Sequence, residues 1–224
     1  MQRRLCRVST LYKTRIYQEF ARVARAMASD RRLELLDLLA QASRHVEALA
    51  RETGMSVANV SQHLQVLRAA HLVQADRVGN RVVYGLAGPD VLNLWLALRG
   101  VAEQRLPEIR QISEAFAIGG SDGEVVSRRR LAAELASNRM VLLDVRPAIE
   151  YEQGHIPGAI SMPPGELPSR IGELPRDRPI VAYCRGSYCL LADEAVALLR
   201  SYGFEAYRLE GGWPEWTVAE LTSR

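Results

Sequence analysis

A cysteine placed between a predicted strand and a predicted helix is the feature of this sequence best suited to chemistry. The β-branched and aromatic residues 180–183 indicate a buried strand that runs directly into Cys184. A short loop with glycine and serine follows, and residues 190–199 have the apolar spacing of an amphipathic helix. Unpaired backbone N–H groups and the positive end of a helix dipole favour the thiolate, which is the nucleophilic form of cysteine. We therefore predict that Cys184 is a nucleophile.

The rest of the loop and the end of an earlier strand complete the predicted catalytic site. Arg185 and the loop amides are expected to lower the pKa of the Cys184 thiol, and Gly186 lets the backbone turn inward without a Cβ clash. Asp144 and Arg146 end another predicted strand; they either position the loop or pair with each other, and we favour a structural role for Asp144. The predicted site comprises Cys184, Arg185, Gly186, Ser187, Tyr188, Cys189, Asp144 and Arg146.

Cys189, the second thiol of the loop, has two interpretations. It could resolve an oxidised or persulfidated Cys184 into a disulfide, which would make the loop a switch. It could equally be a small apolar residue packed in the first turn of the helix. The sequence leaves both open.

Length and composition indicate a soluble protein of two domains. A chain of 224 residues suits two domains of about 100 residues each, and 48% hydrophobic and 25% charged residues are ordinary for globular proteins. The longest nearly apolar stretch, residues 91–98, is too short to span a membrane, and the basic N-terminus lacks the apolar segment of a signal peptide. Three cysteines do not make a disulfide framework, so we expect a cytoplasmic protein without a membrane partner and interpret Cys6 as an idle thiol.

The net charge of +3 is divided unevenly along the chain. Residues 1–117 contain 17 Lys and Arg against 11 Asp and Glu, a balance of +6, whereas residues 118–224 contain 12 against 15, a balance of −3. A basic half can approach phosphates, although chance scatter of surface charge is the alternative explanation. Residues 118–123 hold three glycines, a serine and an aspartate, which is typical of a flexible connector. We predict domains at 1–117 and 124–224 joined by a linker at 118–123.

The first half is predicted to be mainly helical, with one β-hairpin. Helical spacing covers residues 17–27, a stretch from Ser29 or Asp30 onward with Leu33, Leu36 and Leu39 on one face, and residues 46–52, 57–70 and 89–116. Residues 57–70 carry a predicted buried stripe of Val57, Val60, Leu64 and Leu67. Two alternating runs, 72–77 and 81–86, are joined through Gly79 and Asn80, a pair that favours a tight turn.

Three helices followed by a hairpin are typical of a winged helix-turn-helix domain. If the apolar stripe of residues 57–70 points inward, small and amide side chains point outward and can bond base edges in the major groove. Arginines beside the hairpin tip can contact phosphate or the minor groove. A small helical domain with a merely solvated polar face is the alternative. The predicted DNA-binding residues are Ser56, Ala58, Asn59, Ser61, Gln62, Gln65, Arg77 and Arg81.

This half resembles the ArsR family of bacterial repressors over nearly all its length. The resemblance is carried by residues 26–33, 56–67 and 80–86, which read AMASDRRL, SVANVSQHLQVL and NRVVYGL. It implies a homodimer, paired through the N-terminal and long terminal helices, that binds a near-palindromic operator in double-stranded DNA and represses transcription.

Many members of this family sense metals through a cysteine pair before the recognition helix. The corresponding residues 43–49 read SRHVEAL and contain no cysteine, and the terminal helix carries Glu103 and Glu108 rather than histidine. His45 and Glu47 alone are too few ligands for a metal ion. We predict no metal site and no cofactor.

The second half alternates between strand and helix signals. Residues 140–145, 180–183 and 206–209 indicate strands, with helical stretches between and after them. The alternation predicts an α/β fold with a largely parallel sheet. In such sheets sites form at the carboxyl ends of the strands, where Asp144 and Cys184 both fall.

This half resembles the rhodanese superfamily from about residue 124 to residue 221. The resemblance is carried by LDVR at 143–146, EYEQGHIPGA at 150–159, the Cys184 loop, and LEGGWPEW at 209–216. It implies that Cys184 takes a sulfane sulfur from a donor such as thiosulfate, becomes a persulfide, and passes the sulfur to a nucleophile. The loop amides would hold the charged outer sulfur. His155 and Trp213 are assigned to packing and hydrogen bonding.

Loop length distinguishes this half from phosphatases and arsenate reductases of related fold. Those enzymes place five residues and then an arginine after the cysteine, so that the arginine grips an oxyanion. Here four residues separate Cys184 from Cys189 and that arginine is missing, so a sulfur atom fits better than a tetrahedral phosphate.

Together the halves predict a sulfur-responsive transcriptional regulator, a repressor that also carries rhodanese-like sulfurtransferase chemistry. One alternative is a sulfurtransferase whose winged half is only a dimerisation scaffold. A second is a repressor with an inert rhodanese-like half that binds a partner, and a third, arsenate reduction, is disfavoured by the short loop. The sequence does not choose between sulfur transfer as a catalytic output and as a sensing event.

Overall fold

The computed structural model describes residues 2–116 and 125–222, so the predicted linker at 118–123 lies outside the described residues. The chain forms two compact units, Met1–Val91 and Leu92–Arg224. The division falls in the first turn of one helix, whereas the predicted domain boundary at 117–124 stays a prediction. No helix within the described residues is long and apolar enough to cross a membrane.

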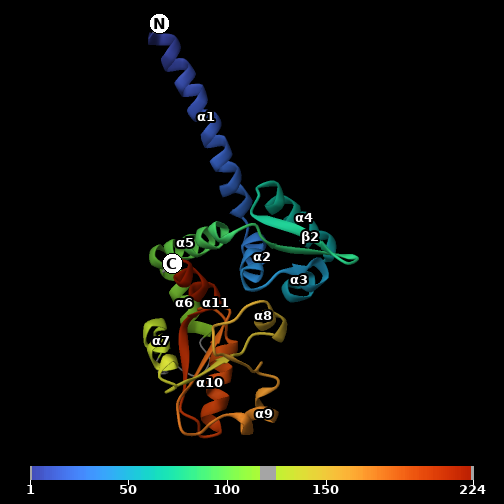
Figure 1. The fold of residues 1–224 in the computed structure, drawn as a ribbon. Coiled ribbons are helices and arrows are strands. Elements are labelled where there is room, and N and C mark those ends of the chain that lie inside the picture. Colours follow the sequence, from blue (N-terminus) through green and yellow to red (C-terminus); the bar gives the residue numbers. More distant parts are fainter. Residues whose placement is uncertain (1, 117–124, 223–224) are drawn as a thin grey trace. The chain divides into compact units, whose positions relative to one another are not determined.

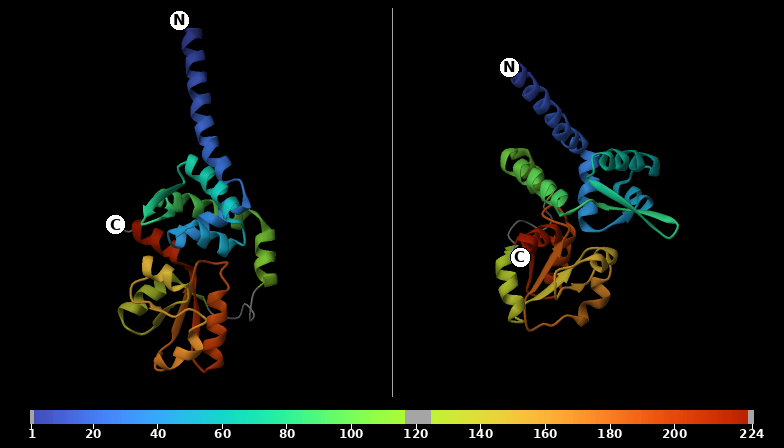
Figure 2. Two further views of the ribbon diagram at one scale, coloured as in Figure 1. Left: turned by 90° about the vertical axis from the view of Figure 1, so that its right-hand side faces the viewer. Right: turned by 45° about the horizontal axis from the view of Figure 1, so that its top comes forward.

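The first unit is a winged helix-turn-helix (Figure 1). Its helices and strands are α1 (Gln2–Met27), α2 (Asp30–Gln41), β1 (Arg44–His45), α3 (Val46–Thr53), α4 (Val57–Ala69), β2 (Val73–Val78) and β3 (Arg81–Leu86). The helix α1 is longer than the predicted residues 17–27, and it extends away from the other elements of this unit (Figure 2). Its side chains from Leu11 to Phe20 are exposed, so tertiary packing within the chain does not account for its length.

The predicted caps of the helix-turn-helix are confirmed. The helix α3 ends at Gly54, whose φ of 67° is left-handed. The Ser56 hydroxyl accepts a hydrogen bond from the Asn59 N–H at 3.2 Å and caps α4. Ser29 occupies the N-cap of α2 without a side-chain hydrogen bond.

The predicted buried stripe of α4 needs one correction. Val60, Leu64 and Leu67 are fully buried, whereas Val57 is 46% exposed. Val57 is the first residue of the helix, so it lies at the end of the stripe, where the neighbouring helices do not cover it. On α2, Leu36 and Leu39 are buried as expected, Leu33 is only partly buried, and the unpredicted Leu35 and Leu38 are buried as well.

The predicted hairpin is confirmed as the wing. Strands β2 and β3 pair antiparallel from Val73↔Leu86 to Val78↔Arg81, with a turn at Gly79, whose φ is 63°. The short β1 adds a third strand, by pairing Arg44 with Tyr84. The register places Arg77 and Arg81 on either side of the turn.

The single long helix predicted over residues 89–116 is wrong, because the structure has two helices. They are α5 (Pro89–Arg105) and α6 (Pro107–Phe116), with Leu106 between them. A proline inside a helix lacks the N–H for the bond to the preceding turn and disfavours helical geometry in the residue before it. Pro107 therefore ends α5 and starts α6.

The second unit contains a five-stranded sheet with helices on both faces (Figures 1 and 2). Strands follow the order β4-β8-β7-β5-β6, and all the pairs are parallel. After α5 and α6, the elements are β4 (Val125–Val126), α7 (Arg128–Ala136), β5 (Val141–Asp144), α8 (Ala148–Gln153), β6 (Ile160–Ser161), α9 (Leu167–Arg170), the 3₁₀ turn η1 (Ile171–Glu173), β7 (Ile180–Cys184), α10 (Leu191–Ser201), β8 (Ala206–Gly212) and α11 (Trp213–Thr222).

Alternate residues of the central strands face two separate apolar cores. Leu143 and Ala182 point to one core with residues of α9 and α10, and Leu142 and Val181 point to the other with residues of α7 and α11. Because both faces are covered, β5 and β7 read as continuous apolar runs. This sheet brings Asp144 and Cys184 to the same edge, since both end neighbouring parallel strands.

Candidate functional site

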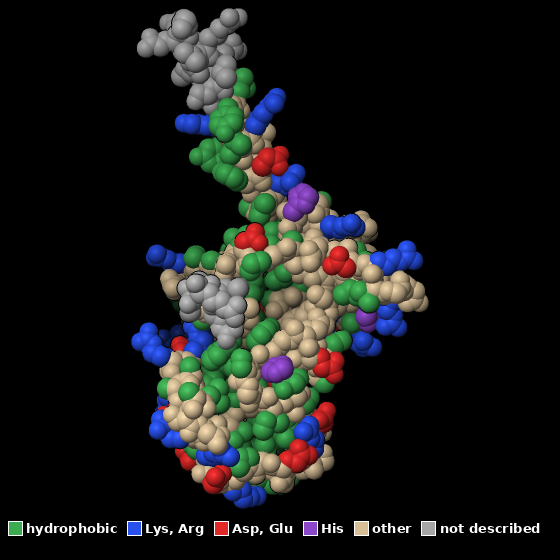
Figure 3. Space-filling model, in the orientation of Figure 1, with side chains coloured by type: hydrophobic (Ala, Val, Ile, Leu, Met, Phe, Trp, Pro, Cys, Tyr) green, Lys and Arg blue, Asp and Glu red, His purple; other side chains and the backbone are tan. Residues whose placement is uncertain are grey.

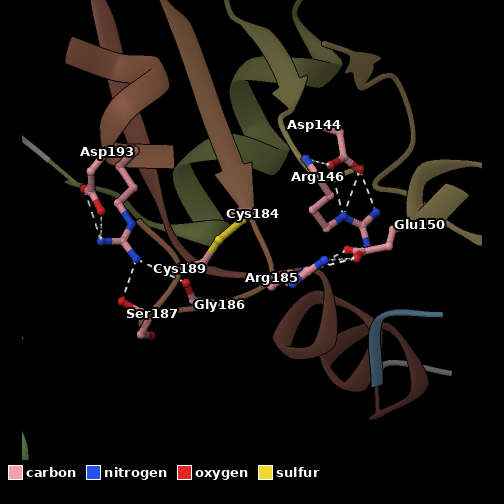
Figure 4. The surroundings of a disulfide bond; sticks show 10 residues. Asp144, Arg146, Glu150, Cys184, Arg185, Gly186, Ser187, Cys189 and Asp193 are labelled. Carbon is pink, nitrogen blue, oxygen red and sulfur yellow. Dashed lines mark hydrogen bonds and ion pairs between the residues drawn. A yellow bond between two sulfur atoms is a disulfide. The ribbon is translucent and has the colours of Figure 1, made fainter. Parts of the chain in front are cut away.

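The predicted nucleophile is bonded to the second thiol of its loop (Figure 4). Cys184 is the last residue of β7 and is 1% exposed, and a disulfide joins it to Cys189 with the Cα atoms 6.2 Å apart. Cys189 also packs against the core beneath α10. The structure thus shows both features that the sequence left open for Cys189, the bond to Cys184 and the partial burial.

Tight backbone approach shapes the loop. The N–H of Cys189 donates to the Gly186 carbonyl at 3.2 Å, and Gly186 has a φ of 150°, which side chains rarely adopt. The end of β8 pairs Gly212 with Cys184. A Cβ on Gly212 would lie 2.3 Å from the Cys184 carbonyl oxygen and 2.6 Å from the Gly186 nitrogen, so only glycine fits there.

Arg208 on β8 holds the carbonyl side of the loop. Its Nη2 donates to the carbonyl oxygens of Ser187 at 2.7 Å and Gly186 at 3.2 Å, while its Nη1 pairs with Asp193 in the first turn of α10 at 3.0 Å. The Asp193 carboxylate and the carbonyl oxygens of Ser187 and Gly186, labelled in Figure 4, all accept hydrogen bonds from this guanidinium. Because these carbonyls are occupied by one cation, the loop is fixed by contacts that do not involve sulfur.

Arg185 points away from the sulfur atoms. Its guanidinium pairs with Glu150 of α8, through Nη2–Oε1 at 2.6 Å and Nε–Oε1 at 2.9 Å, and the Glu150 side chain is fully buried (Figure 4). The carboxylate offsets much of the field that the guanidinium would exert on Cys184. The expected effect of Arg185 on the thiol pKa therefore stays a prediction, and the structure shows Arg185 as an anchor between the loop and α8.

Asp144 and Arg146 pair with each other, which is one of the two predicted alternatives. Arg146 Nη2 lies 2.6 Å from Asp144 Oδ2, and both side chains are 0% exposed. The Tyr183 hydroxyl donates to the same carboxylate at 2.5 Å and accepts from the Ile156 N–H at 3.1 Å. Burial, with the Asp144 charge, raises the pKa of Tyr183 well above its usual range.

This buried cluster braces the base of the site rather than its reacting atoms. Arg146 also donates to the Gly154 carbonyl at 2.7 Å and lies 5.4 Å from the centre of the Trp213 ring. His155 stacks on Tyr151 with ring centres 3.8 Å apart. Both His155 and Trp213 are engaged in packing, as the sequence analysis assigned them.

The loop also contacts α5 within the second unit. The Tyr188 hydroxyl donates to Glu103 at 2.8 Å, and burial and this hydrogen bond raise the pKa of Tyr188 to about 12. Arg99 of α5 pairs with Glu215, whose other oxygen accepts the Gly212 N–H at 2.8 Å. Two residues of one helix are thus joined to the loop and to the strand end beneath it.

The predicted DNA-binding residues lie on α4 and the wing. Ser56, Ala58, Asn59, Gln62 and Gln65 are exposed, and Ser61 is partly exposed. Arg77 and Arg81 are exposed beside the wing turn, where Arg77 Nε donates to the Gly79 carbonyl at 3.3 Å. The exposure is that expected of a reading face, and contact with DNA stays a prediction.

His45 and Glu47 are used locally. The His45 Nδ1 accepts from the Ala48 N–H at 3.2 Å as the N-cap of α3, and the same nitrogen lies 3.0 Å from Glu47 Oε2. A backbone hydrogen bond and His45 lower the pKa of Glu47. Among the described residues, no group of three or more His, Cys, Asp and Glu side chains is placed to hold a metal ion.

Several residues that hold the site were not predicted from the sequence. Arg208, Asp193, Glu150 and Glu215 were not predicted as site residues, although each makes a charged contact to the loop or to its support. The sequence did contain a signal for Arg208. Residues 206 and 208 lie on the same face of a strand, Ala206 is buried, and a charged side chain on a buried face needs a polar partner. The partner of Arg185 could not be read in this way, because it comes from 35 residues away.

Comparisons with known proteins agree with this architecture. Residues 29–75 match the model of the arsR family of bacterial regulatory proteins, and residues 127–219 match the model of the rhodanese-like domain. The chain combines a winged helix-turn-helix regulator with a rhodanese-like domain.

One relative covers nearly the whole chain. The HTH-type transcriptional regulator Rv0324 of Mycobacterium tuberculosis is 44% identical over 93% of this chain and 92% of its own length. The chain therefore belongs to the ArsR family of transcriptional regulators and carries a rhodanese-like domain in its second half.

Partial relatives match each half. A protein named sulfurtransferase from Allochromatium vinosum is 35% identical over 41% of this chain and 85% of its own length. The solution structure of the homodimeric winged helix-turn-helix DNA-binding domain of Mb0332 from Mycobacterium bovis is 45% identical over 42% of this chain and 87% of that chain, with a TM-score of 0.41.

Proposed function

We propose that this protein is a sulfane-sulfur-responsive repressor, in which the reduced Cys184 takes up a sulfur atom and the state of its loop alters operator affinity. The observation that carries the proposal is the placement of Cys184: it ends a central parallel strand, in a loop held by Arg208 and Arg185, on a chain that also carries a DNA-reading fold. In the disulfide form both sulfur atoms are bonded, so the reduced chain is the form that accepts sulfur.

The chemistry of uptake follows from the loop. The Cys184 thiolate attacks the outer sulfur of a donor such as thiosulfate, forms a persulfide, and releases sulfite. The loop N–H groups would stabilise the negative charge of the outer sulfur. Arg208 occupies the carbonyl oxygens of Gly186 and Ser187, which otherwise would be free to turn toward that charge.

DNA binding is assigned to α4 and the wing, in a homodimer. Asn59, Gln62 and Gln65 present amides for base edges, and Arg77 and Arg81 present cations for phosphates. The exposed apolar side chains of α1 include Tyr12, Tyr17 and Phe20, at 66%, 67% and 63% exposure, and a second copy of the chain would cover them. We place the protein in the cytoplasm, where thiols stay reduced.

The test compares operator affinity before and after treatment with thiosulfate, at fixed salt, using the DNA upstream of the protein's own gene. The wild-type chain should change its affinity on treatment, whereas Cys184→Ser should bind DNA equally well in both conditions. Cys6→Ser serves as the matched control for loss of a thiol outside the loop and should respond like wild type. Equal binding by wild type and Cys184→Ser in every condition would contradict coupling between the halves.

A second candidate function is sulfur transfer as the main output, with the winged half as a dimerisation scaffold. The sulfurtransferase relative that matches the second half favours it. Steady turnover of thiosulfate and cyanide to sulfite and thiocyanate, without preference for operator over scrambled DNA, would support this alternative. If Cys184→Ser leaves both repression and effector response unchanged, the rhodanese-like half is instead an inert partner-binding module.

A further inference from the structure

Given the sulfur uptake proposed above, we propose that Cys189 is the resolving nucleophile of the site: it attacks persulfidated Cys184, closes the disulfide, and expels the sulfane sulfur as hydrosulfide. The disulfide between Cys184 and Cys189 shows that the loop brings the two sulfur atoms into bonding contact. The product assigned to the site is therefore hydrosulfide, together with an oxidised loop.

The loop holds the two cysteines close together through hydrogen bonds and an ion pair that do not depend on the disulfide. The Cys189 N–H donates to the Gly186 carbonyl, and Arg208 ties the Gly186 and Ser187 carbonyls to Asp193 at the start of α10. None of these contacts involves a sulfur atom, so reduction of the disulfide removes none of them directly. Cys189 then stays beside Cys184 as an intramolecular nucleophile.

Location favours Cys189 over an external acceptor. Cys184 is 1% exposed in the disulfide form, beneath a loop that is anchored on both sides by Arg208 and by the pair of Arg185 with Glu150. A thiol from solution must reach this buried sulfur through a bimolecular encounter, whereas Cys189 is already in place. Well-oriented intramolecular groups have effective concentrations of about 10⁵–10⁸ M in favourable cases, so resolution should outrun transfer to a small thiol.

The reaction balances without a further oxidant. In the first step the Cys184 thiolate forms a bond to the outer sulfur of thiosulfate, and sulfite leaves with the electron pair of the broken S–S bond. In the second step the Cys189 thiolate forms a bond to Cys184 Sγ, and the outer sulfur leaves with the electron pair and takes the proton lost by the Cys189 thiol. Two cysteine sulfurs are oxidised to the disulfide, and the sulfane sulfur is reduced to hydrosulfide. A dithiol reductant then returns the loop to its starting state.

The experiment uses the full chain with Cys6→Ser, so that the loop holds the remaining thiols. The reduced protein is desalted under anaerobic conditions and mixed with thiosulfate, and intact mass and released hydrosulfide are measured. The parent should lose the mass of two hydrogen atoms and release one hydrosulfide per chain. Cys189→Ser and Cys189→Ala should instead gain the mass of one sulfur atom and release none. A parent sample without thiosulfate should keep both thiols, which excludes oxidation by residual oxygen.

The outcomes separate this proposal from sulfur uptake itself. If the parent keeps the added sulfur and releases no hydrosulfide, as the Cys189 variants do, Cys189 is a packing residue and the resolving role is overturned while uptake stands. If neither the parent nor the Cys189 variants take up sulfur, uptake at Cys184 fails and the resolving role falls with it. Two variants at position 189 are used because either one could misfold. A persulfide formed by either variant shows that this variant still folds and takes up sulfur.

Discussion

At the scale of single residues, charged side chains that hold the Cys184 loop matter as much as the cysteine. Arg208 and Arg185 fix the loop from two sides, one through carbonyl oxygens and the other through the buried Glu150. Neither guanidinium needs to touch a sulfur atom to affect reactivity. In the proposed sulfur uptake, their contribution is to keep the loop N–H groups aimed at the position where charge develops.

Arg208→Gln should slow sulfur uptake by the reduced chain. The variant loses charge-assisted hydrogen bonds to two loop carbonyls, each worth about 1.5–3 kcal/mol when the donor is charged. If half of the free energy of one such bond is lost from the transition state, the rate falls by roughly four- to tenfold. Stopped-flow measurement of sulfite release from thiosulfate gives the rate. Arg170→Gln, which removes a surface arginine paired with Glu166 and Glu173, is the control; an equal rate in both variants would argue against the loop-anchoring role.

Asp144→Asn should destabilise the rhodanese-like domain rather than abolish its chemistry. The change leaves Arg146 buried without its counter-charge, and breaking a buried pair in this way costs about 3–5 kcal/mol. Urea unfolding followed by tryptophan fluorescence measures the loss in free energy of unfolding. Glu134→Gln, at the exposed pair with Arg139, should change stability little. A stable Asp144→Asn protein with slow sulfur uptake would instead place Asp144 in the reaction.

At the scale of elements, the helices α4 and α10 begin in different ways. In α4 the Ser56 hydroxyl caps the helix, whereas α10 begins after Leu190 without a side-chain cap, and the loop before it carries Cys184. Val57, the first residue of α4, is exposed although the apolar pattern predicted it to be buried. An apolar residue in the first turn lies on the buried side of the helical pattern but beyond the edge of the core.

Asn59→Ala on α4 should weaken operator binding more than binding to scrambled DNA. An amide that pairs with a base edge contributes about 1–3 kcal/mol of discrimination, so the operator preference should drop by roughly tenfold or more. Titration of both DNAs by fluorescence anisotropy at one salt concentration measures the preference. Gln104→Ala, which removes an exposed amide from α5, should leave it unchanged. An unchanged preference in Asn59→Ala would remove this residue from the reading face.

At the scale of the whole molecule, we propose α5 as the element that carries the state of the loop. The helix begins at Pro89, before the division between the two units, and its residues Arg99 and Glu103 contact Glu215 and Tyr188 in the rhodanese-like part. With its pKa raised to about 12, the Tyr188 phenol stays protonated at neutral pH and donates to Glu103.

Glu103→Ala should therefore reduce the effect of thiosulfate on operator affinity while sulfur uptake continues. The variant removes the acceptor of the Tyr188 hydroxyl and the partner of Arg99 on the same helix. The ratio of operator Kd before and after treatment is the readout, with sulfite release measured in parallel. Glu108→Ala, at an exposed position on α6, is the control. A full response in Glu103→Ala would mean that α5 does not read the loop through this contact.

The apolar face of α1 should be a contact between two copies of the chain. Hydrophobic side chains gather along this helix beside basic ones (Figure 3), and Leu11, Tyr12, Ile16, Tyr17 and Phe20 are all exposed. Phe20→Glu places a charge in that face and should shift the protein toward the monomer in sedimentation velocity. Arg22→Glu, which reverses a charge on the same helix at a residue paired with Glu19, should keep the parent's mass. A Phe20→Glu dimer of unchanged stability would place the interface elsewhere.

The local pattern of the chain was sufficient for much of the architecture. Apolar periodicity, the Ser56 and Gly54 caps and the Gly79 turn predicted the winged helix-turn-helix, because these signals act between residues close in sequence. The continuous apolar runs of β5 and β7 predicted the parallel sheet and placed Asp144 and Cys184 at one edge. The local pattern gave a wrong prediction at Pro107, because the apolar periodicity continues across the break between α5 and α6.

Only the tertiary structure decided how the site is held. It paired Arg185 with Glu150, Arg208 with the loop carbonyls, and Cys189 with Cys184. Charged partners separated by tens of residues leave no periodic signal, since their meeting depends on strand order and on helix packing across the sheet. The sequence alone thus determined the two classes of domain and predicted Cys184 as the nucleophile, whereas the fold decided which side chains hold the Cys184 loop and which thiol lies beside it.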